Sequence, residues 1–279
     1  MSAAGDNKSR VGRSFHRHAG EYDRFASVQK RVVTHLDRLV EAHLERPPRQ
    51  VLDIGCGTGA MLAAVAHRYP GAALCGLDLA FNMARQSALR FGEQAGCIVN
   101  GDAERLPFRD GAFDLVVSAS TFQWVDRLDV GFGECLRVLQ EGGLLCVAFF
   151  GGRTLWELQE CYREAVNSRF GTTDGRHDRL HRFRDRDEVR RLISRLGCAE
   201  VMVADERELE YHPDVPDLLR SIKAIGAATT GRSVDRGGLG WRGVLADMAN
   251  IYRTRFTDGG MIHATYEVVY VVIRKGGVN

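Results

Sequence analysis

One acid and three glycines give the chain its most distinctive chemistry. The stretch VLDIGCGTGA (51–60) holds Asp53, Gly55, Gly57 and Gly59 as DxGxGxG at the end of an apolar run. Glycines let a backbone turn tightly and approach a ligand closely, and the first amides of a following helix are unpaired. The stretch therefore predicts a binding loop for a nucleotide-like ligand.

The spacing of these glycines separates the candidate ligands. A dinucleotide-binding loop carries GxGxxG, but position 60 is alanine here. A Walker loop needs Gly-Lys-Ser/Thr, which the stretch lacks. The pattern resembles motif I of the class I S-adenosylmethionine (SAM) methyltransferases. That resemblance implies SAM as the cofactor.

Two later acids fall where that family has cofactor ligands. Asp78 ends the next apolar run, 19 residues after Gly59, and a carboxylate there can accept both ribose hydroxyls. In GDAERLPF (101–108), Asp102 can accept the adenine amino group and the Ala103 amide can donate to the ring. The resemblance gives a cofactor set of Asp53, Gly55, Cys56, Gly57, Gly59, Asp78, Leu79, Asp102, Ala103 and Ser118.

Two alternatives stand beside this interpretation. Each motif alone is compatible with ordinary loop chemistry, although the shared register of Asp78 and GDAERLPF weighs against it. We expect Asp53 to act through water or on the amino group of the cofactor; the alternative is that it only orients its neighbours.

The elements that must position these residues alternate along 50–150. Apolar runs typical of strands are separated by helical patterns: QVLDIG, ALCGLDL, GCIVNGDA, FDLVVSAS and GGLLCVAFF. Strands that are apolar on both faces predict a parallel sheet covered on both sides, with right-handed crossovers. Ligands of such sheets bind at the carboxyl edge, where the motifs fall.

Outside 50–150, helical and strand patterns do not alternate in this regular way. Residues 11–45 read as a helix that ends at Pro47-Pro48, and three more helical patterns lie between 151 and 227. AEVMVADERELEY reads as a long strand, and the alternating ATYEVVYVVIRKG as an antiparallel terminal one. We expect a single domain over 1–279, with a helical cap (1–48), a SAM-binding half (49–150) and a substrate half (151–279). The fold class is α/β, Rossmann-like, with a mostly parallel seven-stranded sheet and added helices.

Composition narrows the class of protein further. The 279 residues are 44% hydrophobic and 27% charged, and the net charge of +2 does not suggest a nucleic-acid partner. Neither a membrane span nor a signal peptide is apparent, so we expect a cytoplasmic protein. The seven cysteines form no CxxC pair, which makes zinc and disulfides weak interpretations and predicts no metal.

A narrower resemblance covers nearly the whole chain. The segments VGRSFHRHAGEYDRFASVQ (11–29), TFQWVDRLD (121–129) and above all LLRSIKAIGA (218–227) are similar to the malonyl-acyl-carrier-protein O-methyltransferases of biotin synthesis. The resemblance implies methylation of the free carboxylate of a malonyl thioester carried by an acyl carrier protein. The ester masks a charge that is costly to bury, so that the chain can be elongated toward pimelate.

Candidate acceptor residues follow from these segments. Arg220 and Lys223 lie three apart on one expected helix and can share a face toward the substrate carboxylate; the alternative is a pair of exposed helix cations. Tyr22 fits closure over the cofactor, donation to the acceptor, or simple packing. Gln123 and Trp124 follow the fourth strand, with Trp124 favoured as a pocket wall.

A basic segment is the candidate dock for an acidic carrier protein. Between 176 and 195 the sequence has eight arginines and four acids, which gives this segment a local net charge of +4. The alternative to a docking surface is a solvated helix with salt bridges. Rival functions are a methyltransferase of a quinone precursor or other small acid, and a non-catalytic SAM-binding assembly protein. The Gly-rich connection 229–244 departs from the family pattern and leaves the chain-length preference open. The sequence also leaves open whether the carrier-bound thioester or malonyl-CoA is the acceptor.

Overall fold

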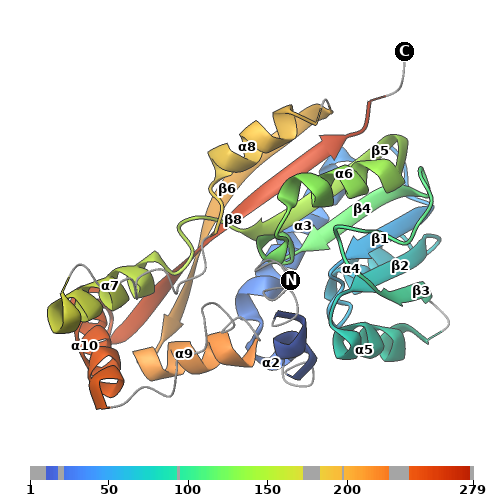
Figure 1. Ribbon diagram of the computed structural model, residues 1–279. Helices are drawn as coiled ribbons and strands as arrows, with labels where there is room; N and C mark the ends of the chain where they lie inside the picture. The colour runs from blue at the N-terminus through green and yellow to red at the C-terminus, as the bar shows by residue number, and fades with distance from the viewer. Residues whose placement is uncertain are drawn as a thin grey trace, which may run out of the picture.

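The computed structural model describes residues 11–17, 22–92, 95–171, 183–196, 198–225 and 239–276. These residues form a sheet in the order β3-β2-β1-β4-β5-β8-β6, with a short β7 paired to β8 (Figure 1). The strands are β1 (Gln50–Ile54), β2 (Ala73–Asp78), β3 (Ala95–Asn100), β4 (Phe113–Ala119), β5 (Leu139–Phe150), β6 (Ala199–His212), β7 (Thr257–Asp258) and β8 (Met261–Arg274). The pairs among β1 to β5 are parallel, and β8 runs antiparallel to both β5 and β6. The predicted α/β class is confirmed.

Helices cover both faces of the parallel part, because its central strands are apolar on both sides. Val51 packs with α3 (Ser27–His43) and α4 (Ala60–Arg68), whereas its neighbour Leu52 packs on the opposite face with α6 (Leu128–Val138). The same second face takes α8 (Arg186–Ser194), and α5 (Phe81–Phe91) lies against β2 and β3. The two core layers hold the carboxyl ends of β1, β2 and β4 at one edge.

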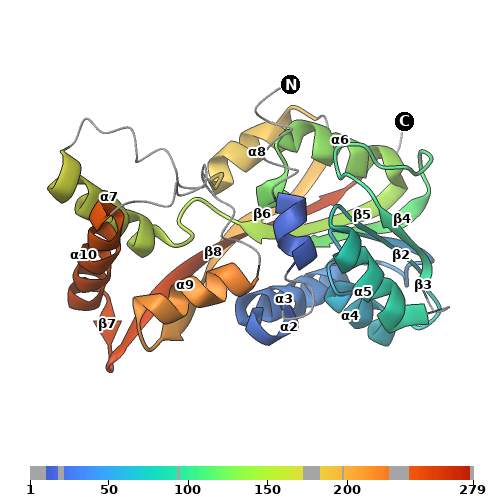
Figure 2. The same ribbon diagram turned by 60° about the horizontal axis from the view of Figure 1, so that its bottom comes forward.

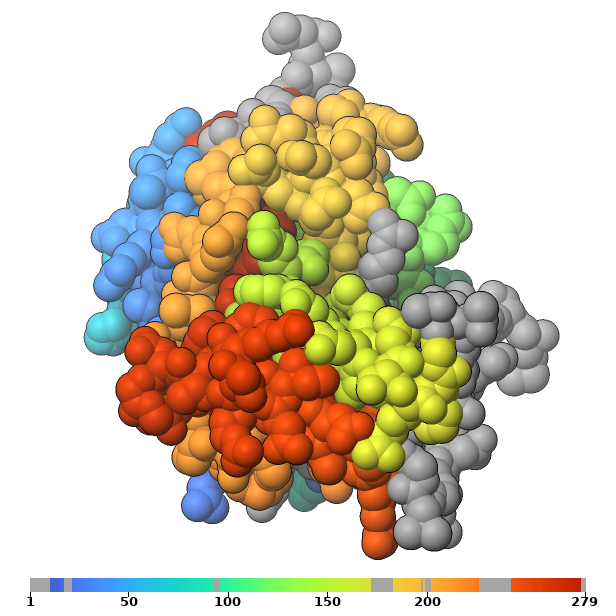
Figure 3. Space-filling model, turned by 90° about the vertical axis from the view of Figure 1, so that its left-hand side faces the viewer, coloured from blue at the N-terminus to red at the C-terminus, as the bar shows by residue number. Residues whose placement is uncertain are grey.

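The two long strands β6 and β8 run diagonally out of this core and carry the remaining helices (Figure 1). At their far end α7 (Trp156–Phe170) packs against α10 (Leu239–Arg255) (Figure 3). Trp156 there meets Phe256, the residue after α10, edge to face. The helix α9 (Val215–Ala224) starts at an Asp214 cap with Pro216 in its first turn and lies beside α2 (Tyr22–Phe25) (Figure 2). A second, largely helical region is thereby built next to the carboxyl edge.

One expectation needs correction. The N-terminal segment is not one helix over 11–45; residues 11–17 are helical and α2 and α3 follow, with Ala26 between the last two. The closing strand β8 is antiparallel as expected, and β6 pairs on its outer side. Of the Gly-rich connection, 229–238 lie outside the described residues, and 239–244 belong to α10. Along the described ranges, no helix combines the length and apolarity needed to cross a membrane.

Candidate functional site: a cofactor cleft joined to an acceptor pocket

The glycine loop turns as the spacing predicts. Gly55, Gly57 and Gly59 have φ of 70°, 54° and 86°, a region that favours glycine. The Gly57 amide donates to one oxygen of Asp78 at 2.9 Å, and the Ala80 amide donates to the other at 2.7 Å. Burial raises the pKa of Asp78 to about 6, although both of these hydrogen bonds act to lower it. The loop after β1 is therefore fastened to the end of β2.

Gly55 has a second reason to be glycine. A Cβ built there would lie 2.0 Å from Oγ1 of Thr121, in the turn that follows β4. The Thr121 side chain occupies that space and donates to the Gly55 carbonyl at 3.3 Å. The glycine loop and the β4 turn are thus in direct contact, so a change in one displaces the other.

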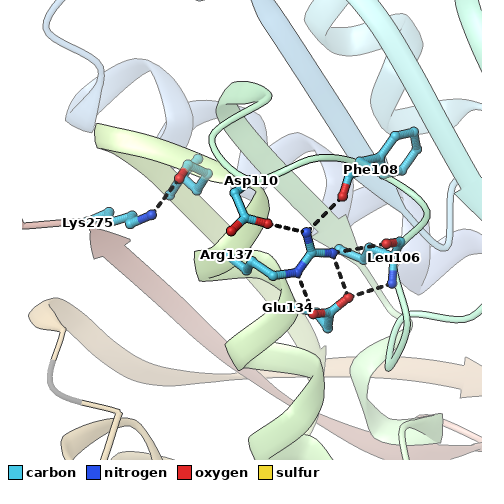
Figure 4. Close-up of polar contacts among 7 residues, drawn as sticks. Leu106, Phe108, Asp110, Glu134, Arg137 and Lys275 are labelled. Carbon is cyan, nitrogen blue, oxygen red and sulfur yellow. Dashed lines mark hydrogen bonds and ion pairs between the residues drawn. The ribbon is translucent and has the colours of Figure 1, made fainter.

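The predicted adenine loop, GDAERLPF, is held from α6. Arg137 donates to the carbonyls of Leu106 at 3.0 Å and Phe108 at 2.8 Å, and pairs with Asp110 and Glu134 (Figure 4). Glu134 in turn accepts from the Leu106 amide at 2.7 Å. Charge-assisted hydrogen bonds of this kind fix a loop firmly. Asp102, just upstream, is held in a turn by the Glu104 amide at 2.9 Å.

A cleft with about 730 Å³ of open space lies between these loops. Six of the ten predicted cofactor residues line it: Gly55, Gly57, Asp78, Leu79, Asp102 and Ala103. Gly59 instead caps α4, and Ser118 Oγ donates to the Ile54 carbonyl at 2.6 Å within the core. Ser118 therefore supports the end of β1, and neither residue is among those that line the cleft.

Asp53 and Cys56 line an adjoining cavity of about 450 Å³. Asp53 is buried, and neither of its carboxylate oxygens has a hydrogen-bond partner among the described residues. Burial, and then the neighbouring Asp78, raises the pKa of Asp53 to about 8. Lys30 and Asp23 line the same cavity. Charges of both signs fit the amino and carboxylate groups at the methionine end of SAM.

A third cavity, of about 1050 Å³, adjoins the cleft on the side of the second region; we call it the acceptor pocket. The described residues that line it are uncharged: Phe15, Tyr22, Gln29, Ser120, Gln123, Trp124, Phe150, Thr154, Leu155, Leu158, Gln159, Phe183, Leu219, Ile222, Ile225 and Tyr266. Tyr22 and Ser120 line all three cavities. Burial, with Asp78 and Asp23 nearby, raises the pKa of Tyr22, so its hydroxyl stays protonated.

The structure brings the predicted positioning residues together but not the two cations. Trp124 is a wall of both the cleft and the acceptor pocket and meets Phe15 edge to face, with ring centres 6.0 Å apart. Arg220 and Lys223 are exposed on α9, outside the described lining, and Arg220 pairs with Asp217 at 3.0 Å. Their contact with the substrate stays a prediction.

Sequence reasoning missed several residues of the acceptor pocket. Leu219, Ile222 and Ile225 lie in the LLRSIKAIGA segment, whose apolar spacing signals that this face packs inward. Ser120 gave no such signal. Tyr266 comes from the middle of β8, and no local pattern marks it as a site residue.

Comparison with known proteins defines the class. Residues 52–147 match the family model of a methyltransferase domain. The fold resembles a Bacillus halodurans C-125 crystal structure, with a TM-score of 0.60, 16% identity and coverage of 88% of this chain and 100% of that one. It also resembles Haemonchus contortus phosphoethanolamine N-methyltransferase 2 in complex with SAM, with a TM-score of 0.55, 16% identity and coverage of 93% and 57%. Together with the cleft, these findings define a SAM-dependent class I methyltransferase.

The family is narrower than the class. A malonyl-[acyl-carrier protein] O-methyltransferase from Geobacter sulfurreducens is 47% identical, with coverage of 96% of this chain and 99% of that one. Another, from Methylovorus sp. (strain MP688), is 38% identical with coverage of 95% and 88%. The chain belongs to the malonyl-[acyl-carrier protein] O-methyltransferase family.

Proposed function

We propose that this enzyme methylates the free carboxylate of a malonyl thioester carried by an acyl carrier protein, an early step of biotin synthesis. SAM, when bound in the cleft, supplies the methyl group from its sulfonium. The chain must then present an acceptor where the cleft and the acceptor pocket meet, exclude water there and hold the acceptor in line.

One observation carries this proposal: the described lining of the acceptor pocket contains no aspartate, glutamate or histidine. A phenol or a carbon acceptor often needs a general base, whereas a carboxylate is already ionised near neutral pH. A pocket of amides, hydroxyls and apolar side chains beside the cleft therefore suits an acceptor that brings its own charge. The α9 segment that carries the family resemblance forms one of its walls.

The test is a direct assay of the purified enzyme with SAM. Malonyl-carrier protein, malonyl-CoA and a quinone precursor are compared by mass spectrometry for the gain of one methyl group. Acetyl-carrier protein is the matched control because it lacks only the carboxylate. We expect methylation of a malonyl thioester and none of the acetyl one. If SAM binds but neither malonyl thioester is methylated, the proposal is wrong.

The carrier protein itself is the second part of the proposal. Five exposed arginines of the basic segment lie in the described residues, on and next to α8: Arg184, Arg186, Arg190, Arg191 and Arg195. Arg186 is paired with Asp187 and Asp205, and Arg184 donates to the carbonyl of Asp126, two residues past Trp124. Arg176, Arg179 and Arg182 lie outside the described residues.

A charge reversal tests this docking surface. Arg184, Arg190, Arg191 and Arg195 are changed to glutamate together, and the KM for malonyl-carrier protein is measured at low salt. We expect a rise for the carrier-bound substrate and no change for malonyl-CoA, since only the carrier is a large acidic partner. An unchanged KM for the carrier substrate means that this surface is not the dock. A cytoplasmic location is part of the same proposal, and the seven free cysteines fit a reducing compartment.

A further inference from the structure

Ser120 stands out by its backbone. It follows β4 directly and has φ of 59°, and only one other non-glycine residue in the described part of the chain, Leu155, has positive φ. Such a conformation is costly for a residue with a Cβ and persists only where the surroundings fix it. Glycine would adopt this conformation more easily, so the presence of serine points to a role for its side chain.

The surroundings of Ser120 fix its backbone from three sides. Its amide donates to the Ala148 carbonyl at 2.7 Å, and its carbonyl accepts from Nε2 of Gln123 at 2.8 Å. Gln123 is itself held by the Phe150 amide, which donates to its Oε1 at 3.4 Å. The next residue, Thr121, fills the space beside Gly55. These contacts hold the Ser120 backbone in place and thereby fix the direction in which its side chain leaves the chain.

The Ser120 hydroxyl lies at the junction of the cavities and lacks a partner among the described residues. Oγ of Ser120 is shielded from solvent and has no hydrogen-bond partner among the described residues. A buried, unpartnered hydroxyl is unfavourable unless a ligand completes it. Ser120 lines the cleft, the Asp53 cavity and the acceptor pocket, so a ligand at the junction lies within its reach.

The charges around the junction indicate which ligand. The Asp53 cavity already holds Asp53, Asp23 and Lys30 for the charged methionine end of SAM. The described lining of the acceptor pocket holds no cation, so a carboxylate there needs neutral donors. Ser120 and Tyr22 carry such donors, and they line the cleft and the acceptor pocket alike, between which the methyl group has to be transferred.

We propose that Ser120 Oγ donates a hydrogen bond to one oxygen of the acceptor carboxylate and thereby points the other oxygen at the methyl carbon. The attacking oxygen forms the new bond to carbon while the carbon–sulfur bond breaks and its electron pair stays on sulfur; no proton moves. Gln123 is a positioning residue, which acts by holding the Ser120 carbonyl. This inference rests on the proposed function and names a residue that selects the carboxylate.

Two variants separate the hydroxyl from the backbone. Ser120→Gly removes the hydroxyl and eases positive φ, whereas Ser120→Ala removes the hydroxyl and keeps the strain. We expect both to lower kcat/KM for malonyl-CoA and for malonyl-carrier protein by about 10- to 100-fold, the loss of a hydrogen bond to a charged group. SAM affinity, measured by calorimetry, should be unchanged and also reports that the cofactor half is folded.

Binding without turnover isolates the carboxylate. With S-adenosylhomocysteine in the cleft, malonyl-CoA should bind Ser120→Gly more weakly than wild type, while acetyl-CoA should bind both alike. Ser194→Ala is the control, because its exposed hydroxyl only caps the Arg191 carbonyl. Gln123→Leu should lower kcat/KM in wild type but add little to Ser120→Gly, since it acts through the same group.

Two results would overturn the inference. A fully active Ser120→Gly beside an impaired Ser120→Ala would show that only the backbone matters and would overturn the inference. Weakened SAM binding with unchanged malonyl-CoA binding would reassign the hydroxyl to the cofactor and overturn it too. Failure of the wild type to methylate either malonyl thioester is a different outcome, which removes the proposed function itself.

Discussion

The cofactor cleft and the acceptor pocket are built in different ways. The cleft includes the turns after β1, β2 and β3, which are fastened by amide donors to Asp78 and by Arg137. The acceptor pocket is made of side chains from distant segments, with Tyr22, Ser120, Leu219 and Tyr266 about 250 residues apart at the extremes. The first design fixes a common ligand, and the second can be altered residue by residue to choose an acceptor.

The two regions also differ in charge. The cleft and its adjoining cavity contain buried carboxylates with raised pKa values, Asp53 and Asp78. The described acceptor lining contains none. The cofactor half therefore keeps one carboxyl, Asp53, buried without a hydrogen-bond partner among the described residues, and such a group is unfavourable in the empty fold. In the described lining of the acceptor pocket, the carboxylate is supplied by the substrate itself.

The strongest way to break this separation is Gly55→Ala. The new Cβ would meet the Thr121 side chain and would also stand at positive φ, so the glycine loop and the Ser120 turn should both be displaced. We expect a loss of about 2–5 kcal/mol, from overpacking and left-handed strain together. Thermal unfolding and SAM calorimetry measure it.

Gly71→Ala is the matched control for that change. No atom lies within 4 Å of a Cβ built at Gly71, so the variant should unfold and bind SAM as the wild type does. Equal behaviour of the two variants would mean that the contact between Gly55 and Thr121 is unimportant. A loss of SAM binding without a loss of acceptor binding would instead sharpen the division between the regions.

Asp53→Asn tests the cost of the buried carboxyl. The folded pKa of about 8 lies above the unfolded value of about 3.8, so the folded state keeps a proton that the unfolded state releases. Stability of the wild type should therefore fall as pH rises between these values and level off above pH 8. We expect the variant to gain stability over the wild type by a few kcal/mol at high pH.

Urea unfolding of the unliganded proteins at several pH values measures this gap. It should widen from about pH 5 to pH 8, while SAM affinity of Asp53→Asn falls. Asp129→Asn is the control, since it removes an exposed carboxylate rather than a buried one. A gap that does not change with pH would show that Asp53 is already ionised in the empty protein.

Asp78→Ala probes the predicted ribose ligand. We expect SAM binding to weaken by about 1.5–3 kcal/mol, the range for hydrogen bonds to a charged group. The KM for the acceptor at saturating SAM should not change, because Asp78 lines the cleft but not the acceptor pocket among the described residues. Calorimetry gives the first quantity and initial rates the second.

The control for Asp78 is another acid that accepts hydrogen bonds from backbone amides, at the amino ends of the strands. Asp114 accepts from the amides of Arg49 and Gln50, at the start of β1. Asp114→Ala should lower stability without changing SAM affinity. If SAM affinity of Asp78→Ala equals that of wild type, the ribose assignment fails.

The sequence predicted the cofactor cleft far better than the acceptor pocket, and the reason is local. Asp78 is the last residue of β2 and Asp102 lies two residues past the end of β3, and parallel strands bring such positions to one edge without further information. Ser118 was placed at the site because it is near the end of β4. The strand runs on to Ala119, which leaves Ser118 in the core and Ser120 at the edge.

The sequence also could not predict which face of α9 packs inward. Helical spacing puts Arg220 and Lys223 in one row and Leu219 and Ile222 in the next, and both rows are possible pocket walls. The packing of α9 against α2 and β6 decides between them, and the contacts with α2 join residues about 200 positions apart. Only tertiary structure holds that information.

The smallest effect is expected at His212, which ties α9 to β6. His212 is buried, with Nδ1 3.0 Å from Asp217 and Nε2 3.3 Å from Glu210. Burial alone would lower the pKa of His212, but the two carboxylates outweigh it and raise the pKa. The charged imidazole therefore stabilises the fold at low pH, and this contribution is lost as pH rises through the raised pKa.

His212→Gln should cost about 1–2 kcal/mol at slightly acid pH and less at high pH, where the wild type has lost its charge as well. Other groups face the same pair, since Arg220 bonds Asp217 and Tyr266 bonds Glu210, and these should hold part of the network. Because Tyr266 and α9 line the acceptor pocket, the KM for malonyl-CoA should rise while SAM affinity stays constant. A variant that weakens SAM binding equally would show that the two regions are coupled through β6 and β8, against the separation argued from their construction.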